Sequence, residues 1–257
     1  MKSTILLAML TIVSTVTYSQ KIGIIKDRET NEAIPFVNIG IVGCNKGTVS
    51  NEVGVFQLDV PVSCTQNSIR ISTYGYNSLD LSFEEFDAKF SQGDTALFLL
   101  NQLILEQKEV VVVGRKGKEK ILGKVVESDG ITLQYTSEQL GAQIGVIMPV
   151  KGKRTLLKDF NFYLKQIGYD SVKYRLNIYD YDRKLDKGDS LITKGIIINL
   201  IGDFNGVRTI DLKDKYIRTS SDFIASIEII QAMKGGEVVE HDAIFFGAKF
   251  GGQCRAI

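Results

Sequence analysis

Hydrophobic and polar residues alternate with a period of two along much of the chain, which is the pattern of half-buried β-strands. The clearest block, residues 34–58, reads strand, glycine turn, strand, glycine turn, strand. Pro35 is expected to open the first of these strands. Gly43, Gly47 and Gly54 are expected to lie in the turns, because glycine supplies the positive φ angles that such turns need. The block presents no catalytic group.

The same alternation predicts further strands in the first half, at residues 21–26, 68–74, 79–81, 96–100 and 110–113. Ser82 and Glu85 have the spacing of a capping box, which predicts a short helix. Phe83, Phe86 and Phe90 would share one face of that helix and pack into the core. Short strands at this spacing predict an antiparallel sandwich.

The second half alternates in the same way, at residues 159–164, 172–179, 195–200, 222–229 and 243–246. Residues 195–200 are the most uniformly apolar of these and are expected to form an inner strand. About eight strands with long polar loops and no convincing helix predict a jelly-roll-like β-sandwich.

Several motifs of the first half occur in a fixed order: Gly23, Asp27, Thr30, Pro35, Lys46-Gly47-Thr48, Asn51, Gly54, Phe56 and Gly75-Tyr76. Together they resemble the carboxypeptidase-regulatory-like domain, a transthyretin-like β-sandwich common in exported proteins of Gram-negative Bacteroidota. The resemblance implies an all-β protein that starts with a transthyretin-like seven-stranded sandwich. It concerns the accessory domain of carboxypeptidases. The zinc site of their catalytic domain needs histidine ligands, and this chain has a single histidine.

We expect a signal peptide at residues 1–19, the carboxypeptidase-regulatory-like β-sandwich at 20–109, a strand and basic linker at 110–124, and the second β-sandwich at 125–257. The signal peptide is indicated by Lys2, the apolar run 5–13 and a small-x-small cleavage pattern before Gln20. That run is too short to span a bilayer. The mature chain is therefore expected in the periplasm or at the outer membrane or cell surface, without a transmembrane segment.

Residues 109–114 resemble the segment that follows this domain in starch-utilisation-type, TonB-dependent outer-membrane receptors. The resemblance suggests an accessory role in TonB-dependent transport. The interpretation favoured by the residues themselves is a last strand followed by a solvated linker, because residues 114–124 contain three glycines among five basic residues.

The charge of the chain bears on the kind of partner it binds, and its cysteines bear on whether a disulfide forms. The formal net charge is +1 at pH 7 and the charges are interspersed, which argues against a nucleic-acid partner. A bridge between Cys44 and Cys64 is conceivable, and would leave Cys254 unpaired. The favoured interpretation is that all three thiols are reduced, because two loop cysteines are rarely close by chance.

Two acidic segments are weak metal candidates: Asp180, Asp182, Asp186 and Asp189 in one loop, and Glu240 with His241 in another. Carboxylates suit hard cations, but in the first loop neighbouring lysines and arginines compete for the acids. In the second, no other histidine can join His241. Solvated loops with no metal are therefore the favoured interpretation. Tyrosines are candidate platforms for sugar rings: Tyr135, Tyr163, Tyr179 and Tyr181.

No set of paired catalytic groups emerges, so we expect no enzyme and no cofactor. The sequence favours a non-catalytic exported binding or structural module that contacts an envelope protein or a glycan. An accessory role in TonB-dependent transport is the alternative, and a carboxylate-based hydrolase ranks last.

Overall fold

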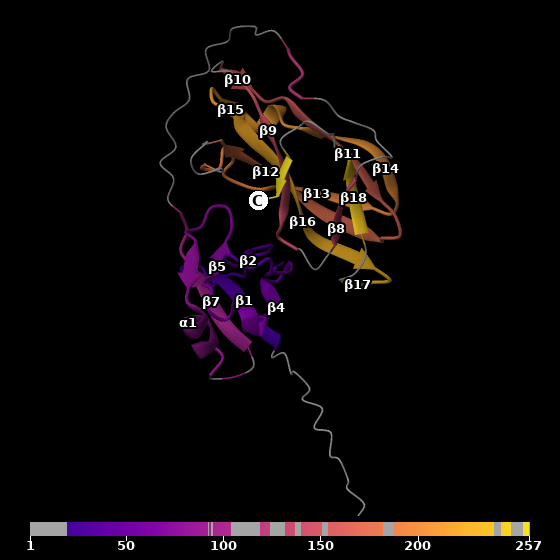
Figure 1. The fold of residues 1–257 in the computed structure, drawn as a ribbon. Helices are drawn as coiled ribbons and strands as arrows, with labels where there is room; N and C mark the ends of the chain where they lie inside the picture. Colours follow the sequence, from indigo (N-terminus) through magenta and orange to yellow (C-terminus); the bar gives the residue numbers. More distant parts are fainter. Residues whose placement is uncertain are drawn as a thin grey trace, which may run out of the picture.

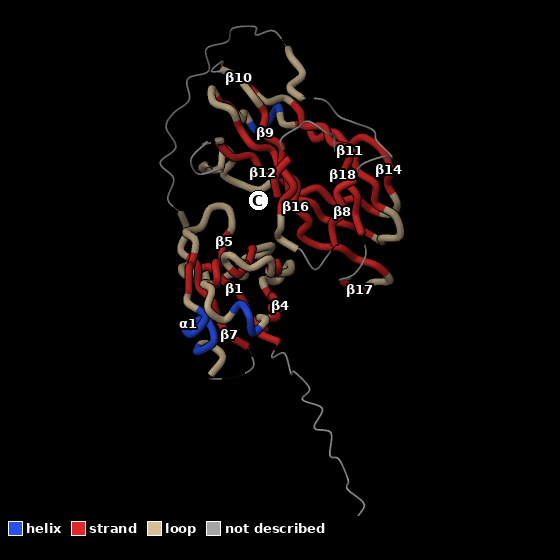
Figure 2. The backbone as a smooth tube through the Cα atoms, viewed as in Figure 1, coloured by secondary structure: helices blue, strands red, loops and turns tan. Residues whose placement is uncertain are grey.

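The computed structural model describes residues 20–91, 93, 95–103, 119–123, 132–136, 140–150, 154–181, 188–238, 243–247 and 254–256. These residues are mostly strand and form two β-sandwiches, the first of which lies below the second in Figure 1. Figure 2 shows how little helix accompanies the strands. The all-β fold class is confirmed. Among the described residues, no helix is long and apolar enough to cross a membrane.

The first sandwich has a three-stranded sheet of order β4-β1-β7 and a four-stranded sheet of order β3-β2-β5-β6. Its strands are β1 Gln20–Asp27, β2 Asn38–Ile41, β3 Gly47–Val49, β4 Val55–Asp59, β5 Ile69–Ser72, β6 Leu79–Leu81 and β7 Thr95–Leu100. Helix α1 (Phe83–Ala88) starts with the predicted capping box, in which Ser82 and Glu85 bond reciprocally. The seven strands agree with the sequence prediction.

Two details differ from the prediction. β1 pairs with β7 in parallel, so the sandwich is not purely antiparallel. A parallel pair needs a long crossover, which the chain between these two strands supplies. Pro35 does not open a strand either. Pro35 and Phe36 form a turn in which Phe36 has a φ of 55°, and β2 starts only at Asn38.

Phenylalanine rings fill the core of the first sandwich. The Phe98 ring centroid lies 5.5 Å from that of Phe56 and 5.4 Å from that of Phe86. A Cβ atom on Gly23 would come within 2.3 Å of the Phe56 ring, so only glycine fits there. Gly54 has a φ of 74°, which favours glycine. Core packing and turn geometry therefore explain these motif glycines.

Asp27 is a buried carboxylate at the end of β1. It accepts hydrogen bonds from the backbone N–H groups of Glu29 and Thr30, from the Tyr76 hydroxyl and from the Gln102 amide, at 2.6 to 2.9 Å. The Thr30 bond first, and then the Gln102 bond, hold the pKa of the Asp27 carboxyl well below its usual range. Burial, and then Asp27, raise the pKa of Tyr76 to about 12. As an anion, Asp27 thus ties its own turn to the isolated β-bridge between Tyr76 and Gln102.

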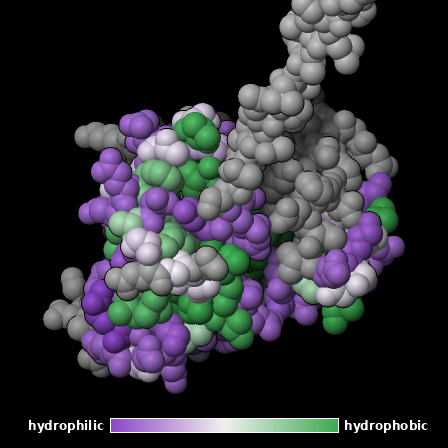
Figure 3. All heavy atoms as spheres, turned by 90° about the horizontal axis from the view of Figure 1, so that it is seen from below, coloured by the Kyte–Doolittle hydropathy of each residue, from purple (hydrophilic) through white to green (hydrophobic). Residues whose placement is uncertain are grey.

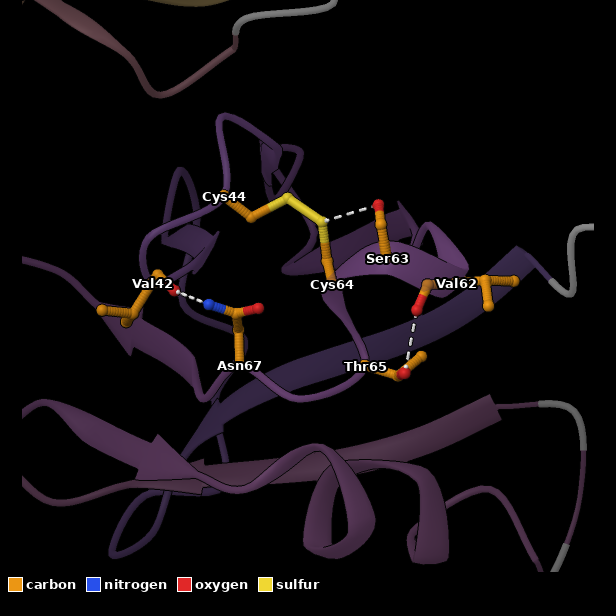
Figure 4. The surroundings of a disulfide bond; sticks show 7 residues. All are labelled: Val42, Cys44, Val62, Ser63, Cys64, Thr65 and Asn67. Carbon is orange, nitrogen blue, oxygen red and sulfur yellow. Dashed lines mark hydrogen bonds between the residues drawn. A yellow bond between two sulfur atoms is a disulfide. The ribbon is translucent and has the colours of Figure 1, made fainter.

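A disulfide joins Cys44 to Cys64, with the Cα atoms 6.2 Å apart (Figure 4). The interpretation that all three thiols are reduced is therefore wrong for this pair. The pairing of β2 with β5 brings the two loops together. The Asn67 side chain also joins them, because its amide donates to the Val42 carbonyl at 2.8 Å. This proximity depends on strand pairing and could not be read from cysteine spacing.

The second sandwich has a six-stranded sheet, ordered β13-β12-β16-β9-β19 with β17 attached to β16, and a four-stranded sheet, ordered β14-β11-β18-β8. A small β10-β15 pair accompanies them. The strands are β8 Thr132–Thr136, β9 Gln143–Met148, β10 Thr155–Leu156, β11 Asp159–Gln166, β12 Ser171–Asp180, β13 Ile196–Ile201, β14 Phe204–Asp211, β15 Arg218–Thr219, β16 Phe223–Lys234, β17 Glu237–Val238, β18 Ala243–Gly247 and β19 Cys254–Ala256.

One hydrophobic core lies between these two sheets. It joins Leu164 and Ile210 of the four-stranded sheet to Tyr174, Leu176 and Ile227 of the six-stranded sheet. The predicted strands at residues 159–164, 172–179, 222–229 and 243–246 are confirmed by β11, β12, β16 and β18.

The prediction that residues 195–200 form an inner strand is wrong, because β13 lies at the edge of its sheet and every second residue of it is exposed. The uniform apolarity of residues 195–200 does not distinguish an inner strand from an edge strand, because an edge strand can also be apolar. Residues 110–118, with the strand expected at 110–113, lie outside the described part, so the domain boundaries stay predictions.

Candidate functional site

The acidic loop predicted as a weak metal site is only partly described. The backbone N–H of Asp180 donates to the Asp189 carbonyl at 2.8 Å, and the Asp180 carboxylate accepts from the Ser221 hydroxyl at 2.7 Å. In the described part of the chain, no group of three or more Asp, Glu, His or Cys side chains could hold a metal ion. The other candidates lie outside the described residues: Asp182, Asp186, Glu240 and His241. Their roles stay predictions.

The tyrosines proposed as sugar platforms differ in exposure. Tyr179 is only 7% exposed and its hydroxyl accepts from Gln143 at 3.2 Å, so its ring face is not available to a sugar. Tyr163 is partly exposed, and its hydroxyl donates to Asn205 at 2.6 Å. Tyr181 is also partly exposed, whereas the Tyr135 side chain lies outside the described part.

A buried ion pair occupies the outer face of the six-stranded sheet, where Arg175 of β12 lies opposite Glu228 of β16. The guanidinium donates to both carboxylate oxygens, at 2.5 and 3.0 Å, and the two side chains are 5% and 1% exposed. The Asn177 amide donates to the same carboxylate at 2.9 Å. Charge-assisted bidentate pairs of this kind are among the strong hydrogen bonds of proteins.

The first sandwich completes this network. Arg175 donates to the Phe36 carbonyl at 2.7 Å and to the Asn38 side chain. The Tyr74 hydroxyl donates to the Asn177 side chain at 2.7 Å. Burial raises the pKa of Tyr74 above its usual value, so it acts as a neutral donor. We call Arg175, Asn177 and Glu228, together with Phe36, Asn38 and Tyr74, the joint cluster.

Contacts around the joint cluster also link the two sandwiches. The Lys173 ammonium lies 5.2 Å from the centre of the Phe36 ring and forms an ion pair with Glu52. Gly195 lets Arg175 and Tyr74 approach, because a Cβ atom there would lie 2.7 Å from the Arg175 side chain. These side chains are bonded to one another, so we assign the joint cluster the role of holding the sandwiches in one orientation.

Sequence reasoning placed Arg175 and Glu228 in strands but missed their pairing. The available signal was Glu228, the one charged residue in the largely apolar stretch 223–233, since lone buried charges are rare. Which residues would meet was not readable, because the pairing needs the register of β12 against β16.

The outer face of the sheet β4-β1-β7 is apolar and partly exposed. Ile24 lies opposite Val55 on one side and Leu97 on the other, so apolar side chains run across all three strands. Leu97 is 49% exposed and Ile22 is 36% exposed. We call Ile22, Ile24, Val55, Leu97 and Leu99 the β1 face.

Polar residues border the β1 face. Lys26 continues the row of β1 at one end, and Asp59 continues the row of β4 at the other. Gln57 and Thr95 are exposed alongside. Figure 3 views the molecule from below and shows apolar side chains gathered among hydrophilic ones on the visible surface.

Residues 22–112 match the family model of the CarboxypepD_reg-like domain. The matched segment contains nearly the whole first sandwich. It therefore includes both the β1 face and one side of the joint cluster.

A solved structure from Bacteroides uniformis, described as a proposed carbohydrate binding protein, resembles this chain. The similarity covers 93% of this chain and 97% of that one, at 11% identity and a TM-score of 0.20. A similarity at this TM-score carries no argument about fold or function. No curated protein matches the chain.

Proposed function

We propose that this chain is a non-catalytic binding module of the cell envelope, and that its CarboxypepD_reg-like domain binds a partner protein through the β1 face. The observation that carries the proposal is the exposed apolar centre of that face, with Leu97 49% exposed. Soluble proteins rarely leave a large contiguous apolar patch open, and such patches mark interaction sites.

The margin of the β1 face also fits a protein partner. An apolar centre with a polar rim is the ordinary anatomy of a protein interface. Lys26 and Asp59 place charges of opposite sign at the two ends. A partner with an apolar ridge and an acidic group opposite Lys26 would complement this arrangement.

Two observations support a location in the envelope. Disulfides persist in oxidising compartments such as the periplasm, and Cys44 and Cys64 are bonded. Residues 1–19 carry the signal-peptide pattern.

The joint cluster supports a scaffold role, because it would hold the second sandwich fixed relative to the β1 face.

The test is a pull-down with the tagged mature chain, residues 20–257, from membrane and periplasmic fractions. Wild type is compared with Leu97→Lys, which places a charge at the centre of the β1 face. The control is Val62→Lys, because Val62 is 75% exposed and lies in the same sandwich outside that face.

We expect wild type and Val62→Lys to capture the same partner, and Leu97→Lys to bind it at least about tenfold more weakly, because a charge would replace a central apolar contact. Equal capture by all three proteins would refute the proposal.

Two further experiments test the alternatives. A glycan panel run in parallel would reveal a sugar-binding module if a glycan binds the mature chain and no longer binds when the second sandwich is deleted. An outer-membrane receptor lost on deletion of residues 109–124 would instead favour the transport alternative.

A further inference from the structure

The free edge of β13 presents an uncharged row of large apolar residues. β13 pairs with β12 and, among the described residues, with no other strand. Its six residues are Ile196, Ile197, Ile198, Asn199, Leu200 and Ile201. Natural edge strands are usually protected by charges, prolines or bulges, and an apolar edge without them is a template for another strand.

The exposed side chains of β13 lie on one face of the sheet. Ile201 is 81% exposed, Ile197 is 46% exposed, and Asn199 between them is exposed as well. The first sandwich therefore does not cover this strand, although it packs against the neighbouring β12. The charge that lies opposite Asn199 on β12 is Lys173, and it is paired with Glu52.

The backbone of β13 is oriented for further pairing. The Gly202 N–H donates to the Asp170 carbonyl at 2.8 Å, next to the pair Ser171–Ile201. In an antiparallel ladder, hydrogen-bonded and non-hydrogen-bonded pairs alternate. The even-numbered residues of β13 therefore bond to β12, and the N–H and C=O groups of the odd-numbered residues point to the free edge.

These odd-numbered residues match a second copy of the same strand. A two-fold axis through Asn199 would place Ile197 opposite Ile201 of the other copy, and Asn199 opposite its own equivalent. Each of the three pairs would exchange two backbone bonds, about six in all, and each strongly exposed isoleucine would cover an isoleucine of the other copy. No like charges would meet within the strand.

We propose that a second copy of this chain pairs antiparallel with β13, so that the six-stranded sheets of two copies form one continuous sheet. The contact is isologous and closed, as in most homodimers. It concerns a different sandwich from the β1 face and goes beyond the proposed function. The short strand limits the buried area, so we expect a dimer that dissociates on dilution.

The first test measures the mass of the mature chain by sedimentation across a concentration series. We expect wild type to pass from monomer to dimer as the concentration rises. Ile201→Lys should raise the dissociation constant of the dimer at least about tenfold, because its ammonium would lie against Ile197 of the other copy. Val62→Lys is the control, since Val62 is 75% exposed and lies in the first sandwich, between β4 and β5, whereas β13 belongs to the second. A monomer throughout, or a dimer that Ile201→Lys leaves unchanged, would overturn the proposal.

The second test determines the register between the two β13 strands, in a chain that also carries Cys254→Ser. Asn199→Cys should give a disulfide-linked dimer under mild oxidation, because equivalent Cα atoms on the axis would lie about 5.5 Å apart. Ile197→Cys should not, because its equivalents would be separated by about four residues, or roughly 13 Å. Cross-linking of Ile197→Cys alone would refute the register.

The outcomes separate this proposal from the preceding one. Leu97→Lys should leave the dimer intact, and Ile201→Lys should leave partner capture intact. If the free edge instead binds an extended segment of another protein, the chain would stay monomeric by sedimentation and Ile201→Lys would abolish that capture. That result would identify the edge as a docking site but refute the dimer.

Discussion

Replacing Glu228 with glutamine tests whether the joint cluster depends on a buried charge. Glutamine keeps the size of the side chain, so no cavity forms, but Arg175 loses its counter-charge. The pair is 5% and 1% exposed, and removing one partner of a buried pair destabilises a protein by about 3 to 5 kcal/mol. The Phe36 carbonyl and Asn38 would remain as partners of Arg175, which places the expected loss near 3 kcal/mol.

The chain offers a matched control in Arg70 and Asp80. This pair is also bidentate, at 2.6 and 3.0 Å, but its side chains are 55% and 49% exposed. Exposed pairs contribute little, so Asp80→Asn should lower the unfolding free energy by less than about 1 kcal/mol. The two variants differ mainly in burial.

Urea unfolding followed by circular dichroism measures both variants. At a slope of about 2 kcal/mol/M, a loss of 3 kcal/mol lowers the midpoint by about 1.5 M, against less than about 0.5 M for Asp80→Asn. Equal shifts, or a Glu228→Gln midpoint within about 0.25 M of wild type, would refute the burial argument.

A paired variant separates stability from orientation. Arg175→Met with Glu228→Leu replaces the buried charges by apolar groups, which is often neutral for stability. The Phe36 carbonyl and Asn38 would lose their donor. We therefore expect near-wild-type unfolding of the second sandwich, with faster hydrogen exchange at residues 34–39. Unchanged exchange there would show that Arg175 does not fix the first sandwich.

Three further predictions concern the first sandwich. Cys44→Ser should lower its unfolding free energy by up to about 3 kcal/mol, because the bond closes a loop with a sequence separation of 20, and dithiothreitol should reproduce the loss in wild type during urea unfolding. Asp27 has a lowered pKa, so the stability from its ionised form is present above about pH 4 and is lost as the pH falls below that value. Asp27→Asn should remove this part of the pH dependence in denaturation at pH 3 to 7. Phe98→Ala should cost about 3 to 5 kcal/mol by calorimetry, because the ring is fully buried among other phenylalanines.

Local features of the first sandwich were determined by the sequence itself. The period-two alternation located most of its strands, and the Ser82 and Glu85 spacing located α1. The order of the glycine, asparagine and aspartate motifs was enough to recognise the family. These features depend on residues close together in the chain, where propensity and turn chemistry decide the structure.

The features that carry the functional proposals needed tertiary structure. Three of them join segments that are distant in sequence: the disulfide, the parallel β1–β7 pair and the Arg175–Glu228 pair. The fourth, the edge position of β13, depends on the order of the strands in the sheet. Alternation shows that a strand has two faces, but not which strand lies beside it or what covers each face. Strand order and register are set by long-range packing, and they decided that Arg175 is buried while Ile201 is exposed.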